Sequence, residues 1–221
     1  MAGLDATTLV AYAIVLLTAF SVHEFAHAWT ANYFGDDTPR MNGRLTLNPL
    51  AHLDPIGSLM LIFAGFGWAK PVPVSLYALE RRSPAAPMWV ALAGPLSNFL
   101  MAVLAAIPFR LGLVKVYYFA GRFGYDSRYL SEFMVQILFI FLTTNLLLMV
   151  FNLLPIFPLD GEKVASYAFP PFMARVLDTI RPYGPMVLLL LIFIGSFAGV
   201  NLLGSILNPP LTAFLRALLG V

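Results

Sequence analysis

The chain has 221 residues, of which 60% are hydrophobic and only 11% are charged, and its mean hydropathy is +0.83. Soluble domains carry roughly 25% charged residues, so this composition excludes an ordinary soluble domain and predicts an integral membrane protein. The formal net charge is +2 without a run of basic residues, which gives no reason to expect nucleic-acid binding. Because there is no cysteine, disulfides and thiolate metal ligands are excluded, and a metal site must use His, Asp or Glu.

The first predicted membrane helix covers residues 9–34, roughly 39 Å of helix, and carries the motif His23-Glu24-Phe25-Ala26-His27 near its end. Histidines four residues apart share one helix face, so both imidazoles can reach one metal ion, with Glu24 beside them as a candidate base. An ionisable side chain inside a membrane span costs roughly 2.5–3.5 kcal/mol on insertion scales and therefore points to function. We favour a metal site over the simpler interpretation, in which these polar residues only cap or line a helix.

Short elements are predicted between the first and second spans. Residues 38–48 contain Asn42-Gly43, a strong two-residue turn signal, and predict a β-hairpin. Residues 72–77 predict a further strand, interrupted by Pro73. We expect these strands to form a small sheet at the membrane face.

Asp54-Pro55 begins a short apolar stretch that ends near residue 63. Asp is a favoured N-cap and Pro a favoured first helical residue, so this pattern predicts a helix. Such a helix is too short to span the bilayer, and we expect a re-entrant or interfacial segment. His52, which precedes it, has no partner at ligand spacing, and we interpret it as a loop or network residue.

The second predicted span covers residues 84–109 and contains no charged residue. Its Gly94-Pro95 pair is consistent with a kink that a membrane helix tolerates. Asn98 is harder to explain as a purely structural residue, because a side-chain amide in the bilayer needs a hydrogen-bonding partner.

The third predicted span, residues 133–154, leads into Pro155 and Pro158, which must interrupt the helix before Asp160. Irregular backbone at membrane depth is tolerated only inside protein or beside a water-filled cavity. Gly161 permits a close approach or an unusual backbone angle. Taken alone, Asp160 is more simply an N-cap, but beside an incomplete two-histidine site we favour a ligand role.

The fourth predicted span covers residues 185–207, after an amphipathic, interfacial stretch at 175–181, and Pro209-Pro210 then leads to an apolar tail. The loops on the side reached by the end of the first helix hold eight Lys and Arg residues, against five on the other side. The positive-inside rule therefore predicts a multi-pass protein of the cell membrane with the metal site towards the cytoplasm and both termini outside.

The chain resembles site-2 proteases in five motifs that occur in the family's order. They cover roughly residues 20–165: His23 to His27; Gly43 to Pro49 with His52 and Asp54-Pro55; Lys70 to Val74; Gly94-Pro95 with Asn98; and Asn152 to Gly161. The resemblance implies an intramembrane zinc metalloprotease with a three-helix catalytic core. It implies one Zn²⁺ per chain, with His23, His27 and Asp160 as ligands and Glu24 as the catalytic base.

We therefore expect an α-helical polytopic membrane protein with about four transmembrane helices, a small membrane-interface β-hairpin or sheet, and a re-entrant segment. Unlike larger members of the family, the chain has no room for a PDZ domain between the second and third spans. A single integral-membrane protease domain is expected over residues 1–221, with its catalytic core at about 9–165 and additional helices at about 166–221.

The expected reaction is hydrolysis of a peptide bond within or near the transmembrane helix of a membrane-protein or peptide substrate. Zinc-bound water is the expected nucleophile and Glu24 the general base. Asn98 is a candidate oxyanion donor or substrate-positioning residue, and a strand edge at residues 44–47 or 72–77 is a candidate surface for the unwound substrate. The alternatives are a metal transporter or sensor with the same ligands and, less favoured, a structural factor with a degenerate site.

Overall fold

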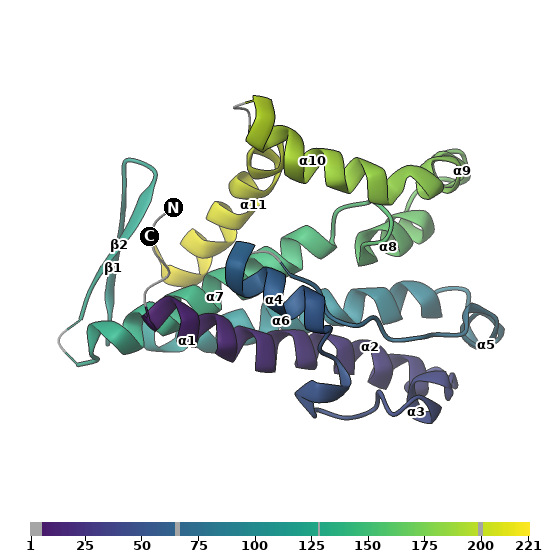
Figure 1. Cartoon of the computed structure of the whole chain (residues 1–221), viewed down its shortest axis with the longest axis horizontal. Helices are drawn as coiled ribbons and strands as arrows, with labels where there is room; N and C mark the ends of the chain where they lie inside the picture. Colours follow the sequence, from purple (N-terminus) through teal and green to yellow (C-terminus); the bar gives the residue numbers. More distant parts are fainter. Residues whose placement is uncertain (1–5, 65–66, 128, 199–200) are drawn as a thin grey trace.

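The computed structural model describes residues 6–64, 67–127, 129–198 and 201–221, and it is predominantly helical (Figure 1). Among these residues, four helices are long and apolar enough to cross a membrane: Thr7–Tyr33, Ala86–Arg110, Glu132–Asn152 and Leu202–Leu219. The predicted multi-pass helical architecture and the first three predicted spans are therefore confirmed.

The first span consists of α1 (Ala6–Val15), the π-helical turn η1 (Leu16–Phe20) and α2 (Ser21–Tyr33). A π-helical turn inserts an extra residue, and such turns are frequent near functional sites. Here the turn directly precedes the motif that begins at His23. The hydrophobic pattern of the sequence did not predict this π-helical turn.

The core of the molecule is formed where α6 (Ala86–Arg110) packs between α2 and α7 (Glu132–Asn152), while α1 packs on α7. Figure 1 shows these helices running side by side. Small residues let membrane helices approach closely. On α6 these are Ala102, Ala105 and Ala106, which are buried together with Leu142 and Leu146 of α7.

The predicted β-hairpin at residues 38–48 is wrong. All of these residues are described, and they form α3 (Thr38–Met41) followed by a turn and loop. Asn42 donates a side-chain hydrogen bond to the Thr38 carbonyl oxygen, and Gly43 adopts a φ of +66°. Asn-Gly supplies the positive φ that ends a helix as well as the one that closes a hairpin, and here it ends a helix.

The strand predicted at residues 72–77 is also absent. Residues 70–75 form no strand, and α5 (Leu76–Arg82) begins after Ser75, whose hydroxyl accepts a hydrogen bond from the Ala78 N–H. Ser75 is a favoured N-cap residue, and its tendency to begin a helix outweighs the alternating pattern at residues 72–77 from which the strand was predicted.

A small sheet is present, but it lies between the second and third spans. It pairs β1 (Lys115–Phe119) antiparallel with β2 (Arg122–Asp126). Ala120 and Gly121 between them have φ angles of 49° and 80°, as a type I′ turn requires. This hairpin was not predicted, although the aromatic residues on both sides of Gly121 are a sequence signal that could have indicated it.

The short helix predicted after Asp54 is confirmed as α4 (Pro55–Ala64), and the Asp54 carboxylate accepts a hydrogen bond from the Gly57 N–H at 2.8 Å. An isolated antiparallel bridge pairs Leu53, which precedes α4, with Ala69, which follows it. A 3₁₀ turn, η2 (Pro49–Ala51), precedes it.

The C-terminal region contains α8 (Asp160–Ala168), α9 (Pro171–Ile180), η3 (Arg181–Tyr183), α10 (Gly184–Ala198) and α11 (Leu202–Leu219). The prediction of one continuous span at residues 185–207 is wrong: residues 199–200 lie outside the described part of the chain, and Asn201 accepts the Gly204 N–H at 2.8 Å and caps a new helix. The fourth described helix that is long and apolar enough to cross a membrane is α11, and Pro209-Pro210 lies inside it rather than before a tail. Most of the predicted amphipathic stretch belongs to α9, which exposes apolar residues including Phe172 and Val176.

Candidate metal centre

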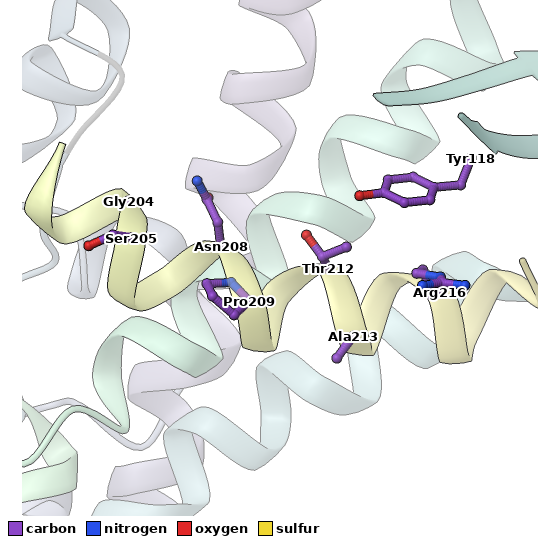
Figure 2. A pocket seen from close by; sticks show the side chains of 8 residues that line it. All are labelled: Tyr118, Gly204, Ser205, Asn208, Pro209, Thr212, Ala213 and Arg216. Atoms are coloured by element: carbon purple, nitrogen blue, oxygen red, sulfur yellow. The ribbon is translucent and has the colours of Figure 1, made fainter. Parts of the chain in front are cut away.

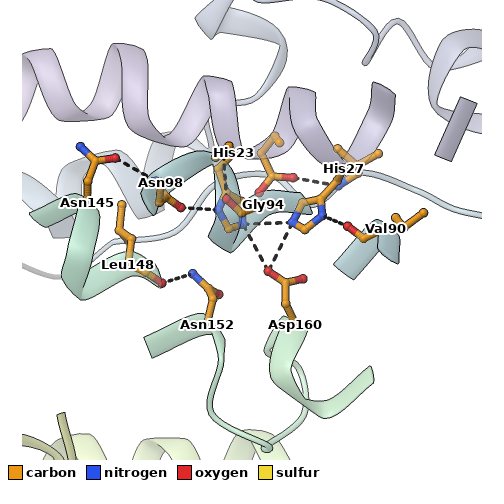
Figure 3. A network of polar contacts seen from close by, with 12 residues as sticks. His23, His27, Val90, Gly94, Asn98, Asn145, Leu148, Asn152 and Asp160 are labelled. Carbon is orange, nitrogen blue, oxygen red and sulfur yellow. Dashed lines mark hydrogen bonds and ion pairs between the residues drawn. The ribbon is translucent and has the colours of Figure 1, made fainter. Parts of the chain in front are cut away.

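The predicted ligand residues converge although α2 and α8 are far apart in the sequence (Figure 3). The Nε2 atoms of His23 and His27 lie 3.0 Å apart, and each lies 3.3 Å from Oδ2 of Asp160. Among the described residues, these three side chains form the group of His, Asp and Glu residues that could hold a metal ion.

The spacing of these three atoms fits zinc. Nitrogen and oxygen ligands lie 2.0–2.2 Å from zinc in tetrahedral sites, which puts neighbouring ligand atoms about 3.3 Å apart. The separations of 3.0–3.3 Å among His23, His27 and Asp160 match one face of such a tetrahedron. The donor set of two imidazoles and one carboxylate leaves a fourth position for water or substrate, as catalytic zinc sites require.

Asp160 is brought to the centre by an abrupt change of direction after α7. Pro155 and Pro158 lie in the irregular segment that follows α7, and Asp160 is the first residue of α8. A Cβ at Gly161 would lie 2.5 Å from the Leu154 carbonyl oxygen and would also clash with that of Leu153. The close approach predicted for Gly161 is therefore confirmed, and it places Asp160 beside the end of α7.

Gly94 makes room for the two imidazoles where α6 crosses α2. A Cβ at this position would lie 2.6 Å from Nε2 of His23 and would also clash with Nε2 of His27. The Gly-Pro pair, interpreted from sequence as a tolerated kink, thus has a steric reason at the centre itself.

Both imidazoles are held from behind through Nδ1. Nδ1 of His23 lies 2.6 Å from Oδ1 of Asn98, and Nδ1 of His27 lies 2.7 Å from the Val90 carbonyl oxygen. Asn98 is completely buried, and its Nδ2 donates to Oδ1 of Asn145 on α7 at 3.0 Å. The predicted need of Asn98 for a partner is met, whereas Val90 and Asn145 were not identified from the sequence.

Glu24 lies on the same wall of the site as the ligands. Its Oε2 accepts a hydrogen bond from the Val72 N–H at 3.2 Å. A cavity of about 160 Å³ opens beside it. Its lining residues are His23, Glu24, His27, Pro71, Val72, Val74, Val90, Ala91, Asn152, Pro158, Asp160 and Lys163.

The segment of residues 70–75, which we call the strap, is fixed at both ends. At one end the Lys70 N–H donates to the His52 carbonyl oxygen at 2.7 Å, and Arg44 donates to the Lys70 and Ala51 carbonyl oxygens. At the other end, the Ser75 N–H donates to Oδ2 of the buried Asp36 at 2.7 Å.

His52 holds the strap through its carbonyl oxygen, and two prolines lie within the strap. His52 is fully buried, with Nε2 2.7 Å from the Thr46 carbonyl oxygen, which confirms its interpretation as a network residue. Pro71 and Pro73 flank Val72, and neither has an N–H group.

The charge of Asp160 is favoured by its neighbours. Burial by itself raises the pKa of this carboxyl, but His27 and His23 more than compensate and hold that pKa well below its usual range. An anionic oxygen is therefore available to a cation at the centre.

The family follows from comparison with known proteins. A family model described as peptidase family M50 matches residues 11–194, most of the chain. The chain belongs to peptidase family M50, the family of the site-2 proteases.

Relatives of this M50 peptidase agree with that assignment. YwhC of Bacillus subtilis (strain 168), named as a candidate zinc metalloprotease, is 40% identical over 178 residues, which are 80% of this chain and 78% of that protein. Rip2 of Mycolicibacterium smegmatis, named in the same way, is 32% identical over 180 residues, which are 80% of this chain and 64% of that protein. No solved structure was found to match the chain.

A second and larger cavity of the M50 peptidase, about 460 Å³, lies along α11 beside Tyr118 (Figure 2). Its polar side chains include Asn208, Thr212 and Arg216, and no His, Asp or Glu lines it. It therefore lacks the candidate ligands and the candidate base that line the first cavity.

Proposed function

We propose that this M50 peptidase, a zinc metalloprotease and multi-pass membrane protein, cleaves a peptide bond within or near a transmembrane helix of a membrane-protein substrate. The observation that best supports this proposal is the triangle of side-chain atoms from His23, His27 and Asp160. It lies beside Glu24, at a cavity lined by residues of a candidate membrane span. Glu24 lies nine residues before the end of α2, about 14 Å along the helix. Hydrolysis would therefore take place below the membrane surface.

In this proposal His23, His27 and Asp160 hold one zinc ion per chain through the three atoms described above. Zinc, when bound, supplies Lewis-acid chemistry, since it acidifies a water molecule and polarises a carbonyl group. The helix spacing of the histidines, the close packing at Gly94 and the position of α8 together preorganise these ligands before substrate arrives.

Glu24 acts as the general base. Its carboxylate takes a proton from the attacking water and later donates it to the leaving amine. The Val72 N–H at 3.2 Å holds one carboxylate oxygen and leaves the other for the proton transfer. Glu24 therefore needs the strap in place for its orientation.

The amide of Asn98 is better suited to orienting His23 than to reaching a substrate, because it is completely buried and both of its polar atoms have partners. Asn152 lines the cavity beside the centre, and its NH₂ group donates one hydrogen to the Leu148 carbonyl oxygen at 3.0 Å, which leaves its second hydrogen for a substrate oxygen. We assign to Asn152 the role of oxyanion donor or substrate-positioning residue that was predicted for Asn98 from sequence.

The strap is the surface against which we place the unwound substrate. A peptide bond in a helix has its amide groups paired, so a local extended conformation must form before attack. Pro71, Val72 and Val74 line the cavity next to Glu24, and a substrate lying along them would pass the ligand triangle.

We also propose that the centre faces the cytoplasmic side and that the chain acts as one integral-membrane domain over residues 1–221. The positive-inside count supports this orientation. Figure 1 shows the hairpin β1–β2 at one end of the molecule and α3 and α5 at the other, so the two sets of loops compared in that count lie at opposite ends. The end of α2 that carries the centre points towards α3 and α5.

The test uses protein purified in detergent. Wild type should contain close to one zinc per chain by elemental analysis and should cleave a single-span test substrate. Asp160→Asn should lose most of the zinc, whereas Glu24→Gln should keep the zinc and lose cleavage. Zinc that is indifferent to Asp160→Asn would contradict the ligand assignment, and full cleavage by Glu24→Gln would contradict the role of the base.

A further inference from the structure

We propose that Asn145 on α7 is a positioning residue for the metal centre, which acts through Asn98 to fix the ring proton of His23 on Nδ1. The inference rests on the proposed zinc site and names a determinant of it outside the cavity. Asn145 contacts neither His23 nor a ligand atom directly in the described contacts, and it is completely buried between the core helices.

The direction of each hydrogen bond follows from one backbone group. The Phe141 carbonyl oxygen can only accept, so the Asn145 side-chain group 2.9 Å from it is the NH₂ group. The oxygen of the Asn145 amide then faces Asn98 at 3.0 Å and accepts from the Asn98 NH₂ group. That orientation turns the Asn98 oxygen towards His23.

These hydrogen bonds determine which ring nitrogen of His23 carries the proton. Because Oδ1 of Asn98 accepts, Nδ1 of His23 at 2.6 Å must donate and carry the proton. In a neutral imidazole the lone pair is then on Nε2, the atom 3.0 Å from Nε2 of His27 and 3.3 Å from Asp160. The hydrogen-bond chain from Asn145 through Asn98 to His23, which we call the relay, therefore directs the Nε2 lone pair of His23 towards the proposed zinc position. It excludes the other tautomer, in which Nε2 carries the proton and cannot bind zinc.

The two histidines differ in how this is achieved. His27 donates to the Val90 backbone carbonyl oxygen, which cannot rotate. His23 depends on two amide side chains, each of which can rotate by 180° if its partner is lost. The Asn145 side chain is therefore the outer element that keeps the Asn98 amide in the metal-compatible orientation.

The direct test measures the zinc dissociation constant of full-length protein in detergent by competition with a chromophoric chelator. Asn145→Leu removes the acceptor for Asn98 and should weaken zinc binding by about 10- to 100-fold, as is typical for loss of outer-shell partners. Asn145→Asp should stay within about threefold of wild type, because an ionised or a protonated carboxyl still offers Asn98 an acceptor oxygen. Asn145→Ala replaces the leucine variant if that variant does not fold.

Leu146→Ala is the matched packing control, since Leu146 is the next residue of α7 and is fully buried. It should lower the thermal midpoint of zinc-free protein without changing the zinc dissociation constant. Asn145→Leu should instead reduce the rise in thermal midpoint that zinc produces.

The outcomes separate the two proposals. Wild-type zinc affinity in Asn145→Leu and Asn145→Ala overturns the relay, while zinc bound by wild type keeps the proposed function. Equal weakening in Asn145→Leu and Asn145→Asp also overturns it, because acceptor direction would then not matter. A wild-type protein that binds no zinc overturns the proposed function, and the relay with it.

Discussion

Gly94 of α6 lies so close to His23 of α2 that a single added carbon at Cβ would come within 2.6 Å of the metal-facing Nε2 atom. This contact links helix packing directly to ligand geometry, because the same position also crowds His27. The close approach of α6 to α2 at Gly94 therefore sets the space in which the two imidazole rings lie.

We expect Gly94→Ala to displace one or both imidazoles. Overpacking in a filled core costs about 1–3 kcal/mol, which corresponds to a loss of about 5- to 150-fold in zinc affinity if the strain falls on the candidate ligands. Chelator competition measures this. Leu96→Ala, on an exposed face of the same helix, is the control and should bind zinc normally. Unchanged affinity in Gly94→Ala would mean that α6 can shift without disturbing the rings.

Val72→Pro removes the N–H that holds the Glu24 carboxylate while leaving the ligands untouched. A hydrogen bond to a charged group contributes about 1.5–3 kcal/mol, so cleavage should slow by about 10- to 100-fold with zinc content near that of wild type. Val72→Ala keeps the N–H and is the control. Single-turnover cleavage of a single-span substrate reports the difference, and equal rates in the two variants would exclude this role for the strap.

Ser75→Pro should release the far end of the strap, because the Ser75 N–H donates to buried Asp36. We expect slower cleavage, by about tenfold on the same hydrogen-bond scale, without loss of zinc. Ser75→Ala retains the N–H and removes only the hydroxyl that caps α5. If Ser75→Pro cleaves at the wild-type rate, anchoring of the strap at this end is not needed for activity.

The absence of cysteine makes the orientation directly measurable. Tyr77 on α5 and Phe119 on β1 are 74% and 81% exposed. The elements α5 and β1 lie at opposite ends of the molecule (Figure 1). In intact cells, a membrane-impermeant maleimide should label Phe119→Cys and spare Tyr77→Cys, and permeabilisation should make both reactive. The reverse pattern would place the centre towards the outside.

Zinc removal should destabilise wild type specifically. A ligand at 100 times its dissociation constant stabilises the folded state by about 2.7 kcal/mol, which corresponds to about 5–10 °C in the thermal midpoint of a chain of this size. A chelator should remove that increment from wild type, and zinc should restore it. Asp160→Asn should show little response to either addition, and a full response from that variant would argue against its place among the ligands.

The first three spans and the convergence of the candidate ligands could be predicted because their signals are local or chemical. The apolar runs indicated the first three helices, and the spacing of His23 and His27 placed them on one face. Asp160 was chosen as the third candidate because two histidines leave a catalytic zinc site one protein ligand short and because the motif order matched a family. Neither argument needed the three-dimensional packing.

The errors arise where one signal serves two structures. Asn42-Gly43 ends the helix α3 instead of closing a hairpin, and Asn201 caps α11 inside an otherwise continuous apolar run. Asn145 was overlooked because one amide in a span does not reveal its partner, which depends on how α6 meets α7. Long-range pairing of this kind has no counterpart in the pattern of a single segment.

The two prolines of the strap limit what that segment can pair with. Pro71 and Pro73 have no N–H, and the Val72 N–H between them is already donated to Glu24. Residues 71–73 therefore offer carbonyl oxygens and no free donor. Two copies that met along this stretch would place acceptors against acceptors, which disfavours edge-to-edge aggregation, whereas a peptide that supplies its own N–H groups can bind there.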